Sequence, residues 1–492
     1  MNPYQRAASF LMRGLAAFAF VWAVVRAHLQ AITGDEGENY VVFVAPHFNQ
    51  IWNFSATNHL LNTLLMRLST AVLGPAPLAL RIPALIGAAL YISAAYWLCR
   101  LITERWEVRL PLFVCLVYNP FVFDYLVAAR GYGLASGLLL FAIALHLWAH
   151  SQDDERRDRV ILPVCALASV SLVLSFTANF SFAFVDAAAG AGLLVWALMD
   201  TGQHWRRIAL WRIVPALATL VVLPGWTLLH AERGQLFWGA ETVREMFRSL
   251  RVSSFYKLND ELANPLVLRA LETLQPYLLR GLLIASAVAL ALHLYKRQRD
   301  AGTRRLLALL AIAGGSVLVS FGIHWTAHVL IRMPLPLERT GLYMVVLTTL
   351  CFGIIAALPA QSRSARIVRT VLLAALCATA VYDLFCLRLN HFREWAYQQD
   401  VDEVYHRVAW YARNRGVKDI EVSWYYYGAL SYYRLAFDDT RTIPSFAKHD
   451  SNSGGKQLYV LNGAFDKDFI EAQKLNVAWR SLRTEVVIAL RE

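Results

Sequence analysis

The chain has 492 residues, of which 57% are hydrophobic and only 17% are charged, against about 25% in a typical soluble domain. This composition excludes an ordinary soluble enzyme. The formal net charge of +12 does not indicate nucleic-acid binding, because cytoplasmic loops of membrane proteins collect lysine and arginine. We therefore expect a multi-pass membrane protein that contacts membrane lipids and has no nucleic-acid partner.

Eleven apolar runs have about the length that crosses a hydrocarbon core of roughly 30 Å. We predict membrane-spanning helices at residues 8–32, 81–103, 109–127, 131–150, 160–177, 180–199, 210–230, 276–295, 305–327, 341–359 and 367–388. If the N-terminus is cytoplasmic, every predicted inner loop is basic, as the positive-inside tendency requires. Four longer segments then lie outside, at residues 33–80, 119–130, 231–275 and from about 390 to the end.

The tail after about residue 390 differs in composition from the rest of the chain. Alternating runs at 420–424 and 457–461 predict strands, and 400–415 and 466–475 predict helices. We predict a transmembrane domain over 1–389 and a small extracytoplasmic α/β domain over 390–492. The amphipathic stretch 58–73 is too short to span comfortably, so we expect it to lie along the outer interface.

Three carboxylates crowd the point where the chain leaves the first predicted span, namely Asp35, Glu36 and Glu38. Most such triplets are solvated acidic turns. The alternative is a general base at the membrane surface, where an acceptor from water can meet a lipid-borne substrate. On this segment alone the solvated turn is favoured.

The segments that follow change this balance. They are 58–65 (Asn-His-Leu-Leu-Asn-Thr-Leu-Leu), 73–74 (Leu-Gly) and 80–85 (Leu-Arg-Ile-Pro-Ala-Leu). With the acidic pair before them, they resemble the first outer loop of the GT-C superfamily of glycosyltransferases, in the branch that contains protein O-mannosyltransferases and lipid A aminoarabinose transferases. Residues 129–132 and 336–340 match less specifically. The resemblance covers roughly residues 10–350 and is strongest over 33–150.

The resemblance implies a GT-C-like polytopic helical fold of about eleven spans, with an interfacial helix in the first outer loop and an extracytoplasmic C-terminal α/β domain. It also implies an inverting hexosyl- or pentosyltransferase of the bacterial inner membrane and cell envelope. The donor would be a polyprenyl-phosphate sugar, and the acceptor a hydroxyl of a lipid, glycan or protein at the outer face. Residues 1–389 would be the catalytic domain, whereas 390–492 would shape acceptor access and supply no catalytic group.

Two departures from related enzymes limit this reading. Aminoarabinose transferases typically have Lys-Pro-Pro where this chain has Thr57-Asn58-His59, so His59 or an arginine must replace a phosphate-contacting lysine. The Trp-Trp-Asp motif of oligosaccharyltransferases is absent from the sequence. N-glycosylation of the kind that those enzymes catalyse is therefore not expected.

Inverting transfer needs one carboxylate to take the acceptor proton and cations to hold the departing phosphate. The resemblance makes Asp35 the expected general base, with Glu36 as the next candidate. The expected substrate contacts are His59, Arg81, Asp124, Arg130, Tyr132, Glu338 and Arg339. Each arginine is equally well explained as an interfacial anchor, and Asp124 could simply pair with Arg130. We expect no cofactor and no metal, since the spacing of the histidines and glutamates in the first loop matches no recognised ligand pattern.

A transporter or flippase of a lipid-linked sugar is the main alternative, because many spans and intramembrane charges suit that class as well. The hydropathy shows no inverted repeat, and polar residues concentrate in the outer loops and not at mid-membrane. A catalytically inactive binding or scaffold protein is a third possibility. Release of polyprenyl phosphate would identify the transferase, since a transporter moves its donor intact.

Overall fold

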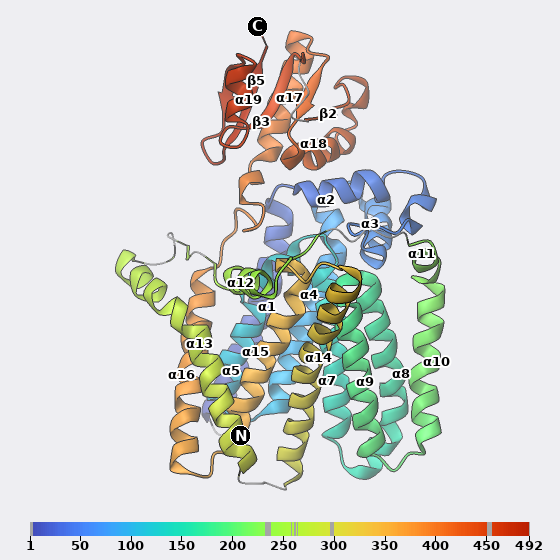
Figure 1. Cartoon of the computed structure of the whole chain (residues 1–492), viewed down its shortest axis with the longest axis vertical. Helices are drawn as coiled ribbons and strands as arrows, with labels where there is room; N and C mark the ends of the chain where they lie inside the picture. The colour runs from blue at the N-terminus through green and yellow to red at the C-terminus, as the bar shows by residue number, and fades with distance from the viewer. Residues whose placement is uncertain are drawn as a thin grey trace.

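The structure is a computed structural model that describes residues 3–231, 238–256, 258–259, 262, 264–295, 300–449 and 455–491. Parts of the predicted outer loop 231–275 (232–237, 257, 260, 261 and 263) lie outside the described residues. The described chain is mainly helical and carries one small sheet near the C-terminus (Figure 1).

The chain is a polytopic helical membrane protein. Among the described residues, nine helices have the length and apolarity needed to cross a membrane. They are α1 (Pro3–Leu29), α4 (Pro77–Ile102), α7 (Tyr132–His150), α8 (Asp154–Ala178), α9 (Ala183–Met199), α13 (Pro265–Tyr295), α14 (Ala301–Ile331), α15 (Leu342–Ala357) and α16 (Arg363–Phe385). The spans of α9 and α15 include the 3-10 turns before these helices and begin at Phe180 and Glu338.

The span predicted at 109–127 is broken into α5 (Trp106–Val117) and α6 (Pro120–Val127), which meet at an angle of 53°. Pro120 occupies the first turn of α6, where no intrahelical N–H is needed. The side chain of Asn119 caps the new helix by accepting from the Val122 amide at 3.3 Å. If the pair counts as one span, the described chain has ten.

The predicted span at 210–230 corresponds to α10 (Trp205–Val222) and the short α11 (Gly225–Leu229). Neither qualifies as a span within the described part of the chain, because Arg206, Arg207 and Arg212 fall within the 18 residues of α10. Nine or ten spans are therefore found by length and apolarity among the described residues, and the count of eleven stays a prediction. Helix α10 still runs along α8 at the edge of the bundle (Figure 1).

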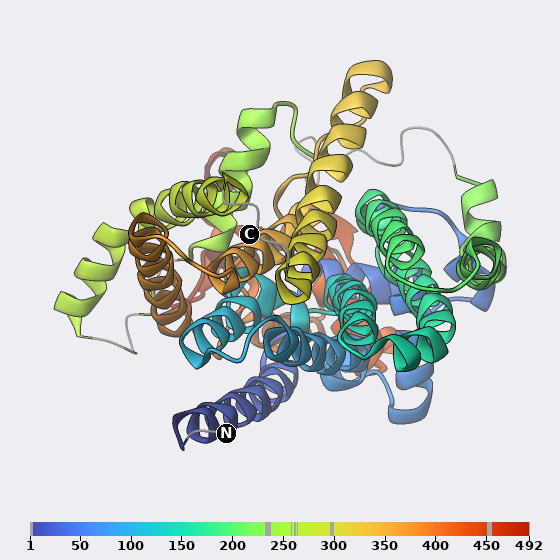
Figure 2. The same ribbon diagram turned by 90° about the horizontal axis from the view of Figure 1, so that it is seen from below.

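Burial is graded across the bundle. In the most apolar stretch of α7, 89% of the residues are buried, whereas in the corresponding stretch of α1 only 22% of the residues are buried. Viewed from below, α1 leaves the side of the bundle and carries the N-terminus at its free end (Figure 2). Large apolar side chains on such outer helices are not covered by other parts of the chain. This is expected for helix surfaces that face lipid.

The first loop folds over the end of the bundle that faces the sheet (Figure 1). It contains α2 (Gly34–Asn39), a π-helical turn at Tyr40–Val44, a 3-10 turn at Phe48–Trp52 and α3 (Leu60–Leu73). Thr33 begins α2 with a capping box, because its hydroxyl accepts from the Glu36 amide at 3.2 Å and Glu36 Oε2 accepts from the Thr33 amide at 3.0 Å. Helix α3 is apolar and 14 residues long, and its position along a membrane interface stays a prediction.

On the same side, α12 (Val243–Ser254) and a 3-10 turn at Glu338–Gly341 precede α13 and α15 respectively.

The C-terminal part contains α17 (Val401–Arg415), β1 (Ile420–Val422), α18 (Trp424–Ala436), β2 (Ala447–Lys448), β3 (Leu458–Asn462), α19 (Lys467–Ala472), β4 (Asn476–Arg480) and β5 (Val486–Leu490). The strand order is β2-β1-β3-β5-β4, with β1 parallel to β2 and β3, and β5 antiparallel to β3 and β4. All five residues of the central strand β3 are buried, as expected for a strand covered on both faces. The domain boundary near residue 390 stays a prediction.

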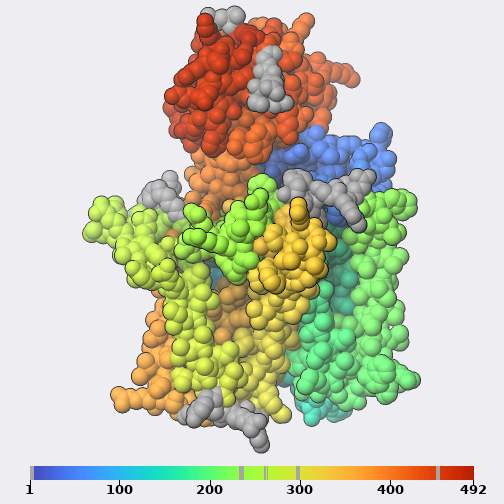
Figure 3. Space-filling view, in the orientation of Figure 1, coloured from blue at the N-terminus to red at the C-terminus, as the bar shows by residue number. Residues whose placement is uncertain are grey.

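The C-terminal part rests on the first loop (Figure 3). Ile32, Val44 and Met66 belong to the same apolar core as residues of α17 and α18. Helices α2 and α18 meet through glycines, since a Cβ added at Gly37 would lie 2.4 Å from the carbonyl oxygen of Gly428. The backbones can come this close only because neither residue has a side chain.

Candidate active site

Asp35 lies between two arginines at the end of the bundle. Its Oδ2 is 3.6 Å from a terminal nitrogen of Arg130 and 3.2 Å from one of Arg339. Arg130 also donates to the backbone carbonyl of Asp35 at 3.2 Å. The Asp35 side chain keeps 29% of its surface exposed, so a solute can reach it. Three segments far apart in the sequence, before α7, in α2 and before α15, therefore meet at one carboxylate.

The charge state of Asp35 follows from these neighbours. Burial opposes its ionisation, but the positive charges of Arg130 and Arg339 outweigh burial and hold the pKa of Asp35 below its ordinary value. At neutral pH the group is therefore a carboxylate, which is the form that can accept a proton.

The position of Arg130 depends on the glycine that follows it. Gly131 has φ of 73°, and a Cβ there would lie 2.1 Å from the carbonyl oxygen of Ala178. Only glycine adopts this conformation in so little space. The sharp turn starts α7 and leaves the Arg130 side chain only 3% exposed, directed at Asp35.

Arg339 is held by aromatic rings and by a second carboxylate. Its guanidinium carbon lies 5.7 Å from the ring centre of Trp238 and 5.9 Å from that of Trp395, within the range of cation–π contacts. Its other terminal nitrogen donates to Glu394, which also accepts from the hydroxyl of Tyr125. Arg339 therefore bridges two carboxylates, Asp35 and Glu394.

His59 and Tyr132 border this cluster. The two rings lie 5.6 Å apart, and His59 is 3% exposed. Burial, followed by the charges of Arg130 and Arg339, holds the pKa of His59 well below its ordinary value, so the imidazole is neutral at pH 7. Its Nε2 is buried and has no hydrogen-bond partner among the described residues. This nitrogen is available for one hydrogen bond to a bound molecule.

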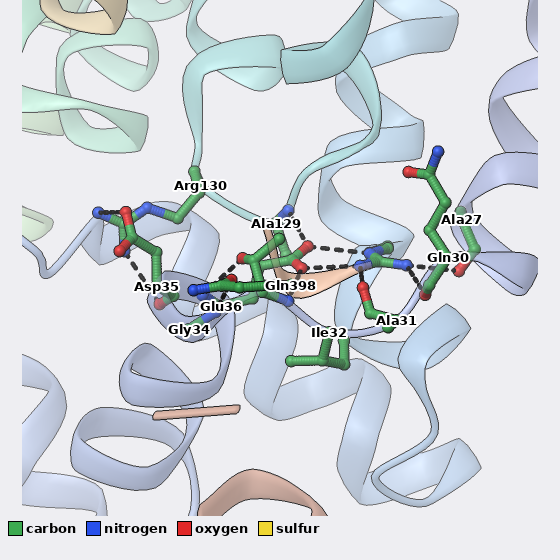
Figure 4. A network of polar contacts seen from close by, with 12 residues as sticks. Ala27, Gln30, Ala31, Ile32, Gly34, Asp35, Glu36, Ala129, Arg130 and Gln398 are labelled. Carbon is green, nitrogen blue, oxygen red and sulfur yellow. Dashed lines mark hydrogen bonds and ion pairs between the residues drawn. The ribbon is translucent and has the colours of Figure 1, made fainter. Parts of the chain in front are cut away.

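Glu36, the second candidate for the general base, and Arg81, an expected substrate contact, pair with each other. Arg81 Nε is 2.9 Å from Glu36 Oε1, and a terminal nitrogen is 2.7 Å from Oε2, with both side chains completely buried. The remaining N–H groups of Arg81 donate to the carbonyls of Ala27, Gln30 and Ala31, and Glu36 also accepts from the Ala129 amide. Figure 4 shows this network. Neither side chain can reach a substrate without breaking this network, and the catalytic role of Glu36 and the substrate contact of Arg81 stay predictions.

Asp124 is likewise committed to neighbouring groups. It pairs with Arg26 at 2.6 Å, and not with Arg130 as the alternative interpretation had it. Its other oxygen accepts from the hydroxyl of Tyr256 at 2.5 Å and from the amide of Arg393 at 2.9 Å. The Asp124 side chain is 5% exposed, so it offers almost no free surface to a substrate.

Glu338 immediately precedes Arg339 but makes no ion pair within the described ranges. It has φ of 47°, which is uncommon for a residue other than glycine, and its amide donates to Ser249 Oγ at 3.1 Å. This left-handed conformation belongs to the turn that carries Arg339 toward Asp35.

The segment 391–398, which was not among the predicted site residues, contacts three of the charged pairs, namely Arg26–Asp124, Arg81–Glu36 and Arg339–Glu394. The ring of Phe392 lies 5.2 Å from the guanidinium carbons of both Arg26 and Arg81. Gln398 accepts from the Gly34 amide at 2.7 Å and donates to the carbonyl of Tyr425, as Figure 4 shows in part. The only signal in the sequence was a charged and aromatic run, His-Phe-Arg-Glu-Trp at 391–395, directly after the last apolar run.

No protein-family model and no curated protein matches the chain. Among solved structures, ArnT from Cupriavidus metallidurans in the apo state is similar over 99% of this chain and 98% of that chain, with 13% identity and a TM-score of 0.44. The structure of ArnT bound to undecaprenyl phosphate is similar over 98% of both chains, with 13% identity and a TM-score of 0.43. The arabinofuranosyltransferase AftD from Mycobacteria is similar over 84% of this chain but 30% of that chain, with 18% identity and a TM-score of 0.42.

Proposed function

We propose that this protein is an inverting glycosyltransferase that moves a sugar from a polyprenyl-phosphate donor to an acceptor hydroxyl at the outer face of the membrane. The observation that carries the proposal is the placement of Asp35, a partly exposed carboxylate in contact with Arg130 and Arg339 at the end of an apolar bundle. A lipid-borne phosphate reaches such a position from the bilayer, and an acceptor reaches it from water.

The chemistry follows from these three groups. Asp35 takes the proton of the acceptor hydroxyl while the acceptor oxygen forms a bond to the anomeric carbon. The bond from that carbon to the phosphate oxygen breaks on the opposite face, and its electron pair leaves with the polyprenyl phosphate. The phosphate gains one negative charge, which the guanidinium groups of Arg130 and Arg339 stabilise because their planar forks match phosphate oxygens.

His59 and Tyr132 complete the donor side in this proposal. The free Nε2 of His59 contacts a phosphate or sugar oxygen, in the place where related enzymes use a lysine. A neutral imidazole supplies one hydrogen bond and no charge, so the two arginines provide the electrostatic part of binding.

A transporter or flippase of a lipid-linked sugar is the second candidate, and one observation favours it. Asp186 lies in α9, and both of its carboxylate oxygens are buried without a hydrogen-bond partner among the described residues. Polar groups inside membrane segments are common in transport pathways. Helix α2, which carries Asp35, lies at the end of the bundle, however, and not at its middle (Figure 1).

The deciding experiment uses the purified full chain in lipid nanodiscs with a panel of undecaprenyl-phosphate sugars and a cell-envelope extract as the source of acceptors. A transferase releases undecaprenyl phosphate when extract is added, and the Asp35→Asn variant does not. If every donor in the panel remained intact while wild-type protein in vesicles moved it across the bilayer, the transporter would be the correct function.

A further inference from the structure

We propose that Glu394, in the segment that joins the last membrane helix to the C-terminal part, is a positioning residue that competes with the donor phosphate for Arg339. The inference rests on the proposed function, because it assigns Arg339 to the donor phosphate. It replaces the expectation that the chain beyond residue 390 only shapes acceptor access.

The contacts of Arg339 show why a competition arises. One terminal nitrogen points to Asp35 Oδ2 at 3.2 Å, and the other donates to Glu394. Both arms of the guanidinium fork are therefore occupied, and the aromatic rings of Trp238 and Trp395 lie next to the group. A phosphate can bind this arginine through two parallel hydrogen bonds only if one carboxylate gives up its arm.

Glu394 is the carboxylate that can leave more easily. Asp35 is held by a second arginine, Arg130, whereas the other polar contact of Glu394 is the neutral hydroxyl of Tyr125. The Glu394 side chain is 24% exposed, so it has space to turn toward water. Release of Glu394 keeps Asp35 in place as the proton acceptor and frees one arm of Arg339.

The charge of the cluster leads to the same conclusion. Arg130 and Arg339 are balanced by Asp35 and Glu394 when both carboxyls are ionised, which leaves no net attraction for an anion. With Glu394 protonated the cluster carries one positive charge, which matches the single negative charge of a phosphodiester. Binding of the donor phosphate is therefore coupled to protonation of Glu394.

The surroundings of Glu394 favour this protonation. Burial raises the pKa of Glu394, and the nearby carboxylates of Asp35 and Glu338 raise it further. The charge of Arg339 and the hydrogen bond from Tyr125 act in the opposite direction but do not cancel burial. Lowering the pH toward the raised pKa should therefore free Arg339.

The test measures the affinity of the full chain for undecaprenyl phosphate between about pH 8 and about pH 5.5. Wild-type protein should bind more tightly as the pH falls. Glu394→Gln keeps the shape and removes the charge, so at the upper pH it should bind roughly 10-fold more tightly than wild type, the value of about one charge-assisted hydrogen bond. The ratio of the two affinities should fall toward one as the pH is lowered, and titration of the lipid phosphate cancels from this ratio because both proteins share it.

Two further variants make the assignment specific. Glu403→Gln removes the same charge from an exposed pair with Arg407 on α17 and should bind like wild type. Tyr125→Phe removes a hydrogen bond that lowers the pKa of Glu394, so the pH at which binding tightens should move upward. This variant tests the same residue without altering its carboxyl.

The outcomes are distinguishable. If Glu394→Gln bound undecaprenyl phosphate equally well or more weakly than wild type at every pH, Glu394 would be a structural residue and the inference would be wrong. If Glu394→Gln did not fold, an unchanged pH dependence in Tyr125→Phe would have the same meaning. If wild-type protein neither bound undecaprenyl phosphate nor released it from any donor, the proposed function itself would fail.

Discussion

Glu36 and Arg81 form an ion pair whose two side chains are both completely removed from solvent. Burial of two charges costs several kcal/mol per ion, and their mutual attraction offsets this cost only when every remaining lone pair and N–H group is satisfied. Here Glu36 accepts from the amides of Thr33 and Ala129 in addition to Arg81. The pair therefore fixes the end of α1, the start of α2 and the turn before Arg130 in one arrangement.

Arg81→Met should destabilise the protein by about 3–5 kcal/mol, because it leaves the buried charge of Glu36 without its partner. Thermal unfolding of the detergent-solubilised protein measures this loss. Arg407→Met breaks the exposed pair with Glu403 and should cost no more than about 1 kcal/mol. An Arg81→Met protein as stable as wild type but unable to bind the donor would return Arg81 to the substrate-binding residues.

Asp35→Asn should lower turnover by about 10² or more while donor binding stays largely intact. Asparagine keeps the size and a hydrogen-bonding oxygen but removes the basic carboxylate. Release of undecaprenyl phosphate under steady-state conditions gives the turnover, and equilibrium binding of the same lipid gives the affinity. Turnover near that of wild type would mean that another group takes the acceptor proton.

Alanine at Arg130 or Arg339 should reduce donor affinity or turnover roughly 10- to 100-fold, the equivalent of about 1.5–3 kcal/mol per charge-assisted contact. Lysine at either position should recover only part of the loss, since it keeps the charge but lacks the planar fork. The same two measurements apply, with Arg100→Ala, in the last turn of α4, as a control that keeps wild-type values. Full activity in both alanine variants would place the phosphate elsewhere.

Stability should fall on acidification, in part because of His59. Its pKa is depressed in the folded protein, so below about pH 6.5 the unfolded chain binds a proton that the folded chain does not, and stability is lost as the pH falls. The difference in Tm between about pH 7.5 and about pH 5.5 should be smaller in His59→Gln than in wild type. An equal difference in both proteins would show that His59 is not buried in its neutral form.

The C-terminal part should be accessible from outside the cell. Lys456 and Lys474 lie in it, and each can be replaced by cysteine and tested separately with an impermeant thiol-reactive probe. Labelling of intact cells would agree with the outer location of Asp35. If labelling required access from the cytoplasmic side, the topology and the outer location of the site would both be wrong.

The sequence was most informative where one short segment decides the structure. The spans follow from local apolarity, so most of them were predictable, and Asp35, Arg130 and Arg339 stand out as charges at the ends of apolar runs. Arg81 has the same signal but points inward, because the position of a residue at a helix end does not fix the direction of its side chain. Helix α18 was not predicted, and Asn119-Pro120 divides what looked like one span.

Long-range pairing was the part that sequence could not supply. Asp124 finds Arg26, which is 98 residues away, and Glu394 finds Arg339 across 55 residues. Glu394 stands in a polar tail in which no periodic pattern separates one carboxylate from another. A single chain gives no measure of which distant charges meet, so these contacts appeared only with the fold.

The glycine contact between Gly37 and Gly428 has a consequence for dissecting the protein into parts. Composition divides the chain near residue 390, yet the backbone two residues from Asp35 rests directly on α18, and Glu394 and Gln398 come from beyond that division. A shortened protein ending at the last membrane helix would lack Glu394 and Gln398, and Gly37 would lose its contact with Gly428. Exchanging the C-terminal part between relatives would therefore require the first loop to be exchanged with it.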